Sequence, residues 1–167
     1  GNINPGRSVA LGTQAGYSNQ GIQAVAIGAS AGYTTQGDYS VAIGANAGNS
    51  NQGSNSVALG IEAGKTKQSN QAVAIGQFAG QTSQGQYSIA MGCGAGESYQ
   101  SDNSIAIGKN AAFDHQGTNS IAIGSDTLCI HNTSVALGSG ATTTADHQIV
   151  LGTAAETVSI PGVCEAN

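Results

Sequence analysis

The stretch Ser40-Val41-Ala42-Ile43-Gly44 decides the fold of this 167-residue chain, because versions of it recur from end to end. Each version closes on a glycine, and these ten key glycines are Gly12, Gly28, Gly44, Gly60, Gly76, Gly92, Gly108, Gly124, Gly138 and Gly152. From Gly12 to Gly124 a key glycine stands at every sixteenth position, and the last two follow at every fourteenth. A fixed period of this kind is typical of a repeat protein, in which each repeat forms one structural unit.

Within the phrase, apolar and small residues alternate, which is the period-2 pattern of a β-strand. A helix is disfavoured, because glycine interrupts the unit every few residues and no 3.6-residue period runs through it. One strand, glycine turns and a second extended segment make one coil of a solenoid, whose strands pair in parallel about 4.8 Å apart. The predicted fold is therefore all-β, a parallel β-roll or β-solenoid of 16-residue and then 14-residue coils.

The repeat also sets the expected domain organisation. We predict that residues 1–152 form the roll, with about ten coils, and that residues 1–7 are an incomplete first coil. Because Gly1 stands in place of a methionine, we interpret the chain as a piece of a longer protein. Val150 replaces the alanine of the phrase and Pro161 cannot continue a paired strand, so residues 153–167 are expected to form a C-terminal cap or a junction to another element.

The alternation separates two faces of the strand, one with Val41 and Ile43 and the other with Ala42. We expect the Val and Ile side chains to form a thin interior, with a second alanine column (Ala15 to Ala111) packed against them. The other face would then be a smooth stripe of small residues in water, which soluble monomers rarely keep. We therefore predict a homo-oligomer, most naturally a homotrimer, with this stripe at the symmetry axis: Ala10, Ala26, Ala42, Ala58, Ala74, Ala90, Ala106, Ala122 and Ala136.

A glutamine column stands eight residues after the key glycines, from Gln20 to Gln116. Stacked amides can hydrogen-bond from coil to coil, as they do in cross-β stacks. We interpret the column as a structural ladder or a set of turn caps. A ligand-binding array of glutamines is the less favoured alternative.

Two variable columns, five and eleven residues after the key glycines, are expected to face outward. Their aromatic members suit contacts with sugars or proteins, through ring stacking and hydrogen bonds. The alternative is that each of these side chains is merely solvated. The predicted ligand-contacting residues are Tyr17, Tyr33, Tyr39, Tyr87 and Phe113.

The composition argues against several other classes of protein. Only 8% of the residues are charged and the four basic residues do not cluster, so no nucleic-acid partner is expected. No apolar run reaches the roughly 18 residues of a membrane-spanning helix, so this segment is not expected to insert directly into a membrane. Neither a Ser-His-Asp arrangement nor a carboxylate pair stands out from the repeat, so the chain is expected to be non-enzymatic and to need no cofactor.

The histidines and cysteines predict no metal site. His115, His131 and His147 recur at every sixteenth position, but neither Cys nor a carboxylate accompanies them at ligand spacing, so we expect exposed turn residues. An anion or metal site at a trimer axis is the alternative for the histidines. Cys93, Cys129 and Cys164 lie in unrelated columns, so free thiols are expected, with an interchain cross-link through Cys164 as the alternative.

The repeated Ser-Val-Ala-Ile-Gly phrase, over residues 8–152, resembles the head domain of trimeric autotransporter adhesins. That resemblance implies a left-handed parallel β-roll, three of which associate into a compact head. The family's repeats have the length of the last two coils here, whereas most coils of this chain are two residues longer. The C-terminal segment, from Asp146 to Gly162, resembles fibre proteins of large DNA viruses and phage-like fibres.

The resemblance implies a function as well. The expected protein is a trimeric surface fibre or adhesin head outside the cell, which attaches to a host or prey cell by multivalent contacts with a surface glycan or protein. The alternative is a virion-associated fibre or spike segment that acts as a spacer on the virion surface. An ice-binding solenoid is less favoured, because the threonines do not form a regular ladder.

Overall fold

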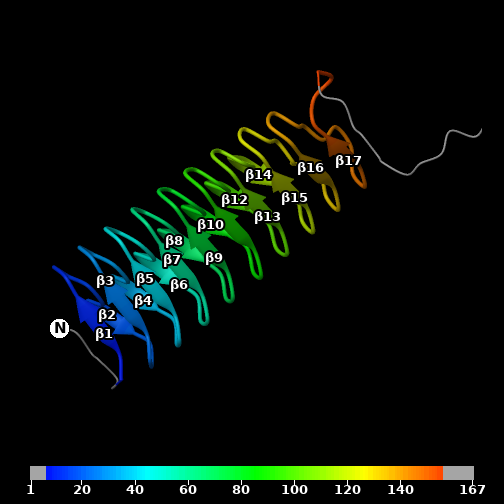
Figure 1. Cartoon of the computed structure of the whole chain (residues 1–167). Helices are drawn as coiled ribbons and strands as arrows, with labels where there is room; N and C mark the ends of the chain where they lie inside the picture. Colours follow the sequence, from blue (N-terminus) through cyan, green and yellow to red (C-terminus); the bar gives the residue numbers. More distant parts are fainter. Residues whose placement is uncertain (1–6, 156–167) are drawn as a thin grey trace, which may run out of the picture.

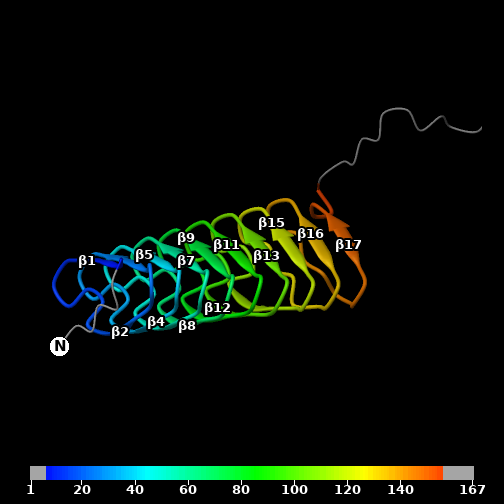
Figure 2. The ribbon, with the colours of Figure 1, turned by 90° about the horizontal axis from the view of Figure 1, so that it is seen from below.

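The computed structural model describes residues 7–155, and in this part the chain forms two parallel sheets and no helix. The sheets run along opposite sides of an elongated roll (Figure 1), which is seen from below in Figure 2. The first sheet consists of β1 (Val9–Leu11), β3 (Val25–Ile27), β5 (Val41–Ile43), β7 (Val57–Leu59), β9 (Val73–Ile75), β11 (Ile89–Met91), β13 (Ile105–Ile107), β15 (Ile121–Ile123), β16 (Val135–Leu137) and β17 (Ile149–Leu151). The second sheet consists of β2 (Ser18–Gln20), β4 (Thr34–Gln36), β6 (Ser50–Gln52), β8 (Thr66–Gln68), β10 (Thr82–Gln84), β12 (Ser98–Gln100) and β14 (Asp114–Gln116).

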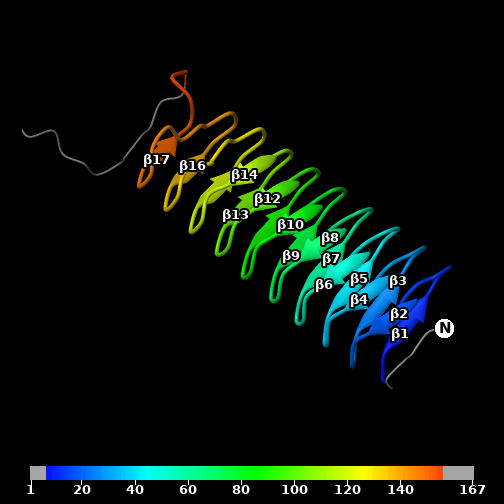
Figure 3. The same ribbon diagram turned by 180° about the vertical axis from the view of Figure 1, so that it is seen from behind.

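Each strand pairs in parallel with the equivalent strand of the neighbouring coil. Along most of the roll, paired residues are 16 positions apart in the sequence, as with Val41 opposite Val57. At its end they are 14 positions apart, as with Val135 opposite Ile149. The same regular stack of coils is visible from behind in Figure 3. The predicted parallel β-solenoid with 16-residue and then 14-residue coils is thus confirmed.

The key glycines end the strands of the first sheet after three residues, two fewer than the phrase suggested. Gly60 has a φ of +129°, and a Cβ added there would lie 2.7 Å from the carbonyl oxygen of Gly76 in the next coil. L-residues rarely adopt this φ, and no side chain fits at that distance from a backbone oxygen. Glycine is therefore required both for the turn and for the close stacking of coils.

Alanine, not valine or isoleucine, lines the interior. The side chains of Ala42 and Ala58 are fully buried within the single chain, and so are those of Ala47 and Ala63 in the second alanine column. Val41 and Ile43, by contrast, are only partly buried and point outward. Our assignment of the two faces of the strand was therefore wrong, although the burial of the second alanine column was predicted.

The reason is the small distance between the two sheets, which a single glutamine side chain spans. Gln36 lies in the second sheet and donates its Nε2 to the carbonyl oxygen of Val25 in the first sheet, at 2.8 Å. Gln52 makes the same bond to Val41 at 2.9 Å. One long side chain per coil fills this gap, so the remaining interior positions accept only small side chains, chiefly alanine and serine.

The coils narrow at the end of the second sheet. Cys129 takes the place of the glutamine. Its backbone carbonyl oxygen accepts a hydrogen bond from Gly117 N at 3.0 Å, which is the bond that the carbonyl oxygen of Gln52 accepts from Gly37 N in the longer coils. Cys129 follows its key glycine by five residues rather than eight. After β14, only an isolated bridge between Leu128 and Thr142 continues the second sheet. The predicted cap at residues 153–167 falls largely outside the described residues, as does most of the incomplete coil at residues 1–7, and both stay predictions.

Candidate functional site

The first candidate surface is the outer face of the first sheet, which we call the aliphatic face. It presents two large aliphatic side chains from each strand, at the positions that flank the buried alanine. Exposure is greatest at the ends, where Leu11 is 66% and Ile149 is 71% exposed, but Leu59 (41%) and Met91 (41%) are also open in the middle. A continuous apolar surface of this length marks an interaction site rather than a surface in contact with water.

This face replaces the predicted alanine interface. Eight of the nine alanines that we placed at the symmetry axis have no exposed surface in the single chain, and Ala10 is partly buried against the same core. The methyl groups of the eight buried alanines touch their own chain, so these residues cannot contact a partner: Ala26, Ala42, Ala58, Ala74, Ala90, Ala106, Ala122 and Ala136. Any interface along the first sheet is made by the Val, Ile, Leu and Met side chains instead.

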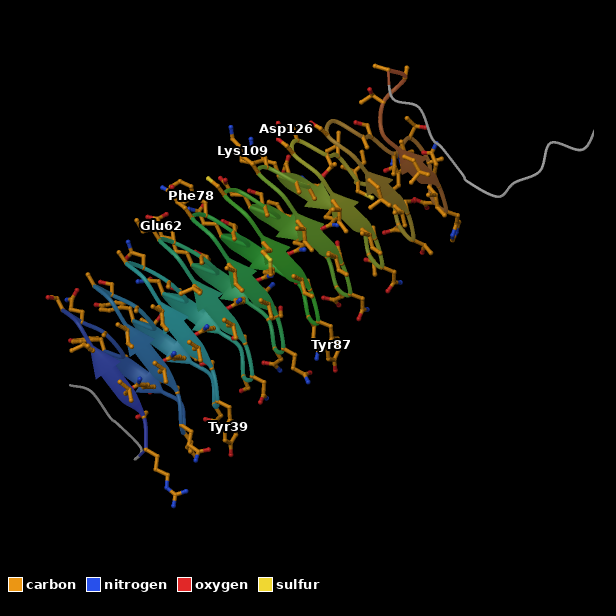
Figure 4. All side chains as sticks on the ribbon, viewed as in Figure 1. Tyr39, Glu62, Phe78, Tyr87, Lys109 and Asp126 are labelled. Atoms are coloured by element: carbon orange, nitrogen blue, oxygen red, sulfur yellow. The ribbon has the colours of Figure 1, made fainter. Side chains whose placement is uncertain are left out.

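The predicted ligand-contacting aromatic residues are at the surface but do not form one site. Tyr39 and Tyr87 project from one edge of the roll, 57% and 53% exposed, three coils apart (Figure 4). Tyr17 and Tyr33 stack on each other in adjacent coils, with ring centroids 5.1 Å apart. Phe113, 45% exposed, lies in that same column but six coils from Tyr17. The five residues thus form three separate groups, and their role in binding stays a prediction.

The edge opposite Tyr39 and Tyr87 carries most of the polar side-chain pairs. Glu62, Phe78, Lys109 and Asp126 all project there (Figure 4). Lys65 donates to Glu62 at 3.1 Å, and Gln81 of the next coil donates to the same carboxylate at 2.7 Å. We call this the charged edge. The charged edge consists of two columns of side chains, one two residues and the other five residues after the key glycines.

Two carboxyl groups of the charged edge have shifted pKa values. Hydrogen bonds from Ser125 (2.7 Å) and Asn110 (2.9 Å), with a smaller contribution from the charge of Lys109, lower the pKa of Asp126. Partial burial raises the pKa of Glu97. Asp126 is therefore held in its charged form, whereas Glu97 carries its charge in a less favourable environment.

Sequence reasoning missed a third surface, the outer face of the second sheet. There the ring of Tyr99 stacks on that of His115 in the next coil, at a centroid distance of 4.8 Å. His115 Nδ1 also lies 2.7 Å from Asp114 Oδ1. These two rings stand seven residues after their key glycines, in a column that the sequence analysis did not single out. The signal that could have found the pair is their spacing of one coil, which places one ring above the other.

The glutamine column is structural. The seven glutamines are 1–3% exposed, so no ligand can reach them, and the alternative of a ligand-binding array was wrong. Gln52, Gln68 and Gln100 each donate to the glutamine of the next coil, at 3.2, 3.0 and 3.1 Å. The predicted coil-to-coil ladder is therefore formed at these three steps.

The histidines and cysteines are dispersed. His131 is half-buried, with Nδ1 3.2 Å from Thr143 Oγ1, while His115 and His147 are exposed. No group of three or more His, Cys, Asp or Glu residues in a metal-binding arrangement occurs within residues 7–155. Cys93 is an exposed and Cys129 a buried free thiol, and Cys164 lies outside the described residues. In the same described part, no helix is suited to crossing a membrane.

Comparisons with known proteins agree with this geometry. The family model for the YadA head domain repeat matches residues 20–47, 100–111 and 116–127. Among solved structures, the roll is similar to the collagen-binding domain of the Yersinia adhesin YadA, at 25% sequence identity and a TM-score of 0.71. That similarity covers 96% of this chain and 89% of the Yersinia domain. No curated protein sequence matches the chain.

Proposed function

We propose that this chain, which is similar to the YadA head in its repeats and its fold, is an adhesin head of the trimeric autotransporter type, and that three copies assemble through the aliphatic face and attach to a host or prey cell surface without catalysis. The proposed location is outside the cell, on a cell surface. The observation that carries the proposal is the aliphatic face itself, whose exposed residues include Leu11, Leu59, Met91 and Ile123.

Copies of the same chain are the partners that best fit this face. Its side chains repeat at the spacing of the coils, so only a partner with the same repeat meets it in register along the whole length of the roll. A closed ring about an axis along the roll also buries all three faces without leaving a free one. Burial of apolar area contributes roughly 25 cal/mol per Å², which favours such an assembly.

Trimerisation in turn explains how a surface without a deep pocket can hold a cell. Three copies present each surface column three times, and each coil repeats it again. Contacts that are weak individually then add through the high effective concentration of the linked sites. The collagen-binding domain of the Yersinia adhesin makes collagen one reasonable probe, beside surface glycans.

The assembly is tested by light scattering on two matched double variants. Glutamate at Val57 and Val73, on the aliphatic face, should convert the trimer to a monomer, because six charges cannot be buried at the axis. Glutamate at Asn51 and Lys67, on the opposite face of the same coils, should leave the trimer intact. A monomeric wild-type chain, or a trimer in both variants, would refute the proposed interface. Circular dichroism shows whether each variant keeps its strands.

Attachment is tested with the purified trimer on whole cells, on collagen-coated surfaces and on a glycan array. The adhesin proposal expects saturable binding to at least one of them, and weaker binding by the monomeric variant. The alternative, a virion fibre or spike segment that only spaces other elements, expects binding to none.

A further inference from the structure

The surface is hollowed where the 16-residue coils give way to the 14-residue coils. The hollow, of about 380 Å³, is lined by Asn110, Phe113, Asp126, Thr127 and Leu128. At this step the shorter coil reaches Cys129 five residues after its key glycine, whereas the preceding coil reaches Gln116 eight residues after its own. We call this hollow the step hollow.

The floor of the step hollow is apolar. The ring of Phe113 is 45% exposed and the side chain of Leu128 is 37% exposed, on consecutive coils. Apolar floors with a few convergent polar groups are typical of ligand sites. Here the aromatic ring offers a flat face on which a planar or cationic group can stack.

The polar groups around this floor are mainly hydrogen-bond acceptors. Asn110 uses its Nδ2 to donate to Asp126, at 2.9 Å, which leaves its Oδ1 as the free end of the amide. The hydroxyl group of Thr127 donates to the carbonyl oxygen of Gly124, at 3.2 Å. A ligand with several hydrogen-bond donors therefore suits this rim.

A second carboxylate, that of Glu97, lies on the Gly94 side of Phe113, beside the step hollow and not in its lining. A methyl group on Gly94 would lie 2.8 Å from Asn110 Oδ1, 3.3 Å from Glu97 Oε2 and 3.6 Å from Phe113 Cδ2, so these three groups surround one point. Within residues 7–155 the carboxylate of Glu97 neither forms an ion pair nor accepts a hydrogen bond. Its charge is partly buried beside an aromatic ring without a counter-ion.

The chain shows elsewhere how this edge neutralises such a charge. Glu62 lies in the same column as Asp126. Its carboxylate forms an ion pair, at 3.1 Å, with the ammonium group of Lys65, which lies in the same column as Glu97 and Phe113. Near Phe113 the corresponding cation is missing. Lys109 is close enough to lower the pKa of Asp126, but it stands one residue after its key glycine and not in the column of Lys65.

We propose that the step hollow receives an arginine side chain of a protein partner, whose guanidinium group stacks on Phe113 and donates to Asp126, while the nearby carboxylate of Glu97 adds to the attraction. A guanidinium group carries five N–H donors in one plane, so it supplies what this acceptor-rich rim lacks and fits the ring face at the same time. The aliphatic stem of the side chain packs on Leu128. This deepens the proposed function, on which it rests, by naming the chemistry of one contact.

The test uses the whole chain in its assembled form and two blocked tripeptides, Gly-Arg-Gly and its citrulline counterpart, which is neutral but nearly the same shape. Binding is followed by NMR through the methyl groups of Leu128. We expect the arginine peptide to shift these signals saturably and the citrulline peptide to bind at least about tenfold more weakly, since the ion pair and the cation–π contact are lost. Equal binding of both peptides, or no shift at Leu128, would overturn the proposal.

Four variants locate the contact. Phe113→Ala and Glu97→Gln should each weaken the arginine peptide about three- to tenfold, whereas Lys109→Gln should strengthen it about twofold by removing a like charge. Glu62→Gln is the matched control and should change nothing, because its carboxylate already has a partner in the chain. An effect of Glu62→Gln as large as that of Glu97→Gln would mean that general charge attraction is responsible.

The outcomes separate this site from the proposed function. If the trimer attaches to cells but neither peptide shifts Leu128, the arginine site is refuted and the adhesin head stands. If the arginine peptide binds in the step hollow but no cell, collagen or glycan surface is bound, the adhesion proposal is refuted and the site stands.

Discussion

The amide of Gln68 donates to Gln84 Oε1 across 3.0 Å, in an interior whose other side chains are mostly methyl groups. The same Nε2 atom lies 2.8 Å from the carbonyl oxygen of Val57, so one group joins two sheets and two coils. Buried polar groups cost free energy unless they are paired. The glutamine ladder is therefore both a spacer and a potential weak point of the roll.

Replacement of Gln68 by Ala should destabilise the roll by about 3 kcal/mol, because it opens a cavity and removes the hydrogen bonds of Gln68 to Val57, Gln52 and Gln84. Gln77→Ala is the control, since Gln77 is exposed, and it should change stability by less than about 0.5 kcal/mol. Chemical denaturation of both variants measures the difference. Equal stability of the two would contradict a structural role for the ladder.

The key glycines should tolerate no side chain. Gly60→Ala places a methyl group 2.7 Å from a backbone oxygen at a φ of +129°, so we expect a loss of more than about 4 kcal/mol or no folded protein. Gly140 also has a positive φ (+69°), but its Cβ would meet only a methyl group, at 3.5 Å. Gly140→Ala should therefore cost only about 1 kcal/mol. Thermal unfolding of both variants tests whether stacking, rather than φ alone, demands glycine.

Thr35 is a site of backbone strain that a substitution should relieve. It is β-branched and has a φ of +47°, whereas asparagine stands at the equivalent positions 19 and 51 with φ values of 53° and 56°. Asparagine accepts the left-handed region more readily than threonine. Thr35→Asn should raise stability by about 0.5–1 kcal/mol. Thr34→Asn, at a neighbouring position without a positive φ, should bring no gain in the same melting experiment.

Glu97 should make stability depend on pH in the acid range. Burial raises its pKa above 4.5 in the folded chain, so the folded state binds its proton more tightly than the unfolded state. The cost of ionising it is absent below the unfolded pKa, appears as pH rises toward the folded pKa, and stays constant above it. Glu97→Gln should therefore melt at a higher temperature than wild type at pH 7, and the gap should close below about pH 4. A gap that persists in acid would point to another cause.

Much of the fold was predictable because the repeat is so regular. The recurrence of Val41-Ala42-Ile43-Gly44 gives the coil length, the parallel register and the glycine turns, since each is a local or nearest-neighbour property. The buried second alanine column and the glutamine ladder were predictable for the same reason. The similarity of the phrase to adhesin heads pointed to the family.

The candidate sites were less predictable. The five aromatic residues were expected to be exposed in two columns, but only the structure shows that they form three separate groups, with Tyr39 and Phe113 apart. The step hollow lies where the coils shorten, and the pairing of Gly117 with Cys129 shows how the shorter coil aligns with the one before it. Spacing along the chain does not show which side chain stands above another where the coil length changes.

The sequence by itself determined the period, the strands and the two faces of each strand, because alternation and glycine spacing are written in consecutive residues. Only the tertiary structure decided which face is inside. Ala42 and Ile43 differ in size, and size alone suggested that the larger side chain is buried. The two sheets, however, lie only one glutamine side chain apart, as the bond from Gln52 to Val41 shows. That gap admits methyl groups and turns the large aliphatic side chains outward, toward the partners that we propose.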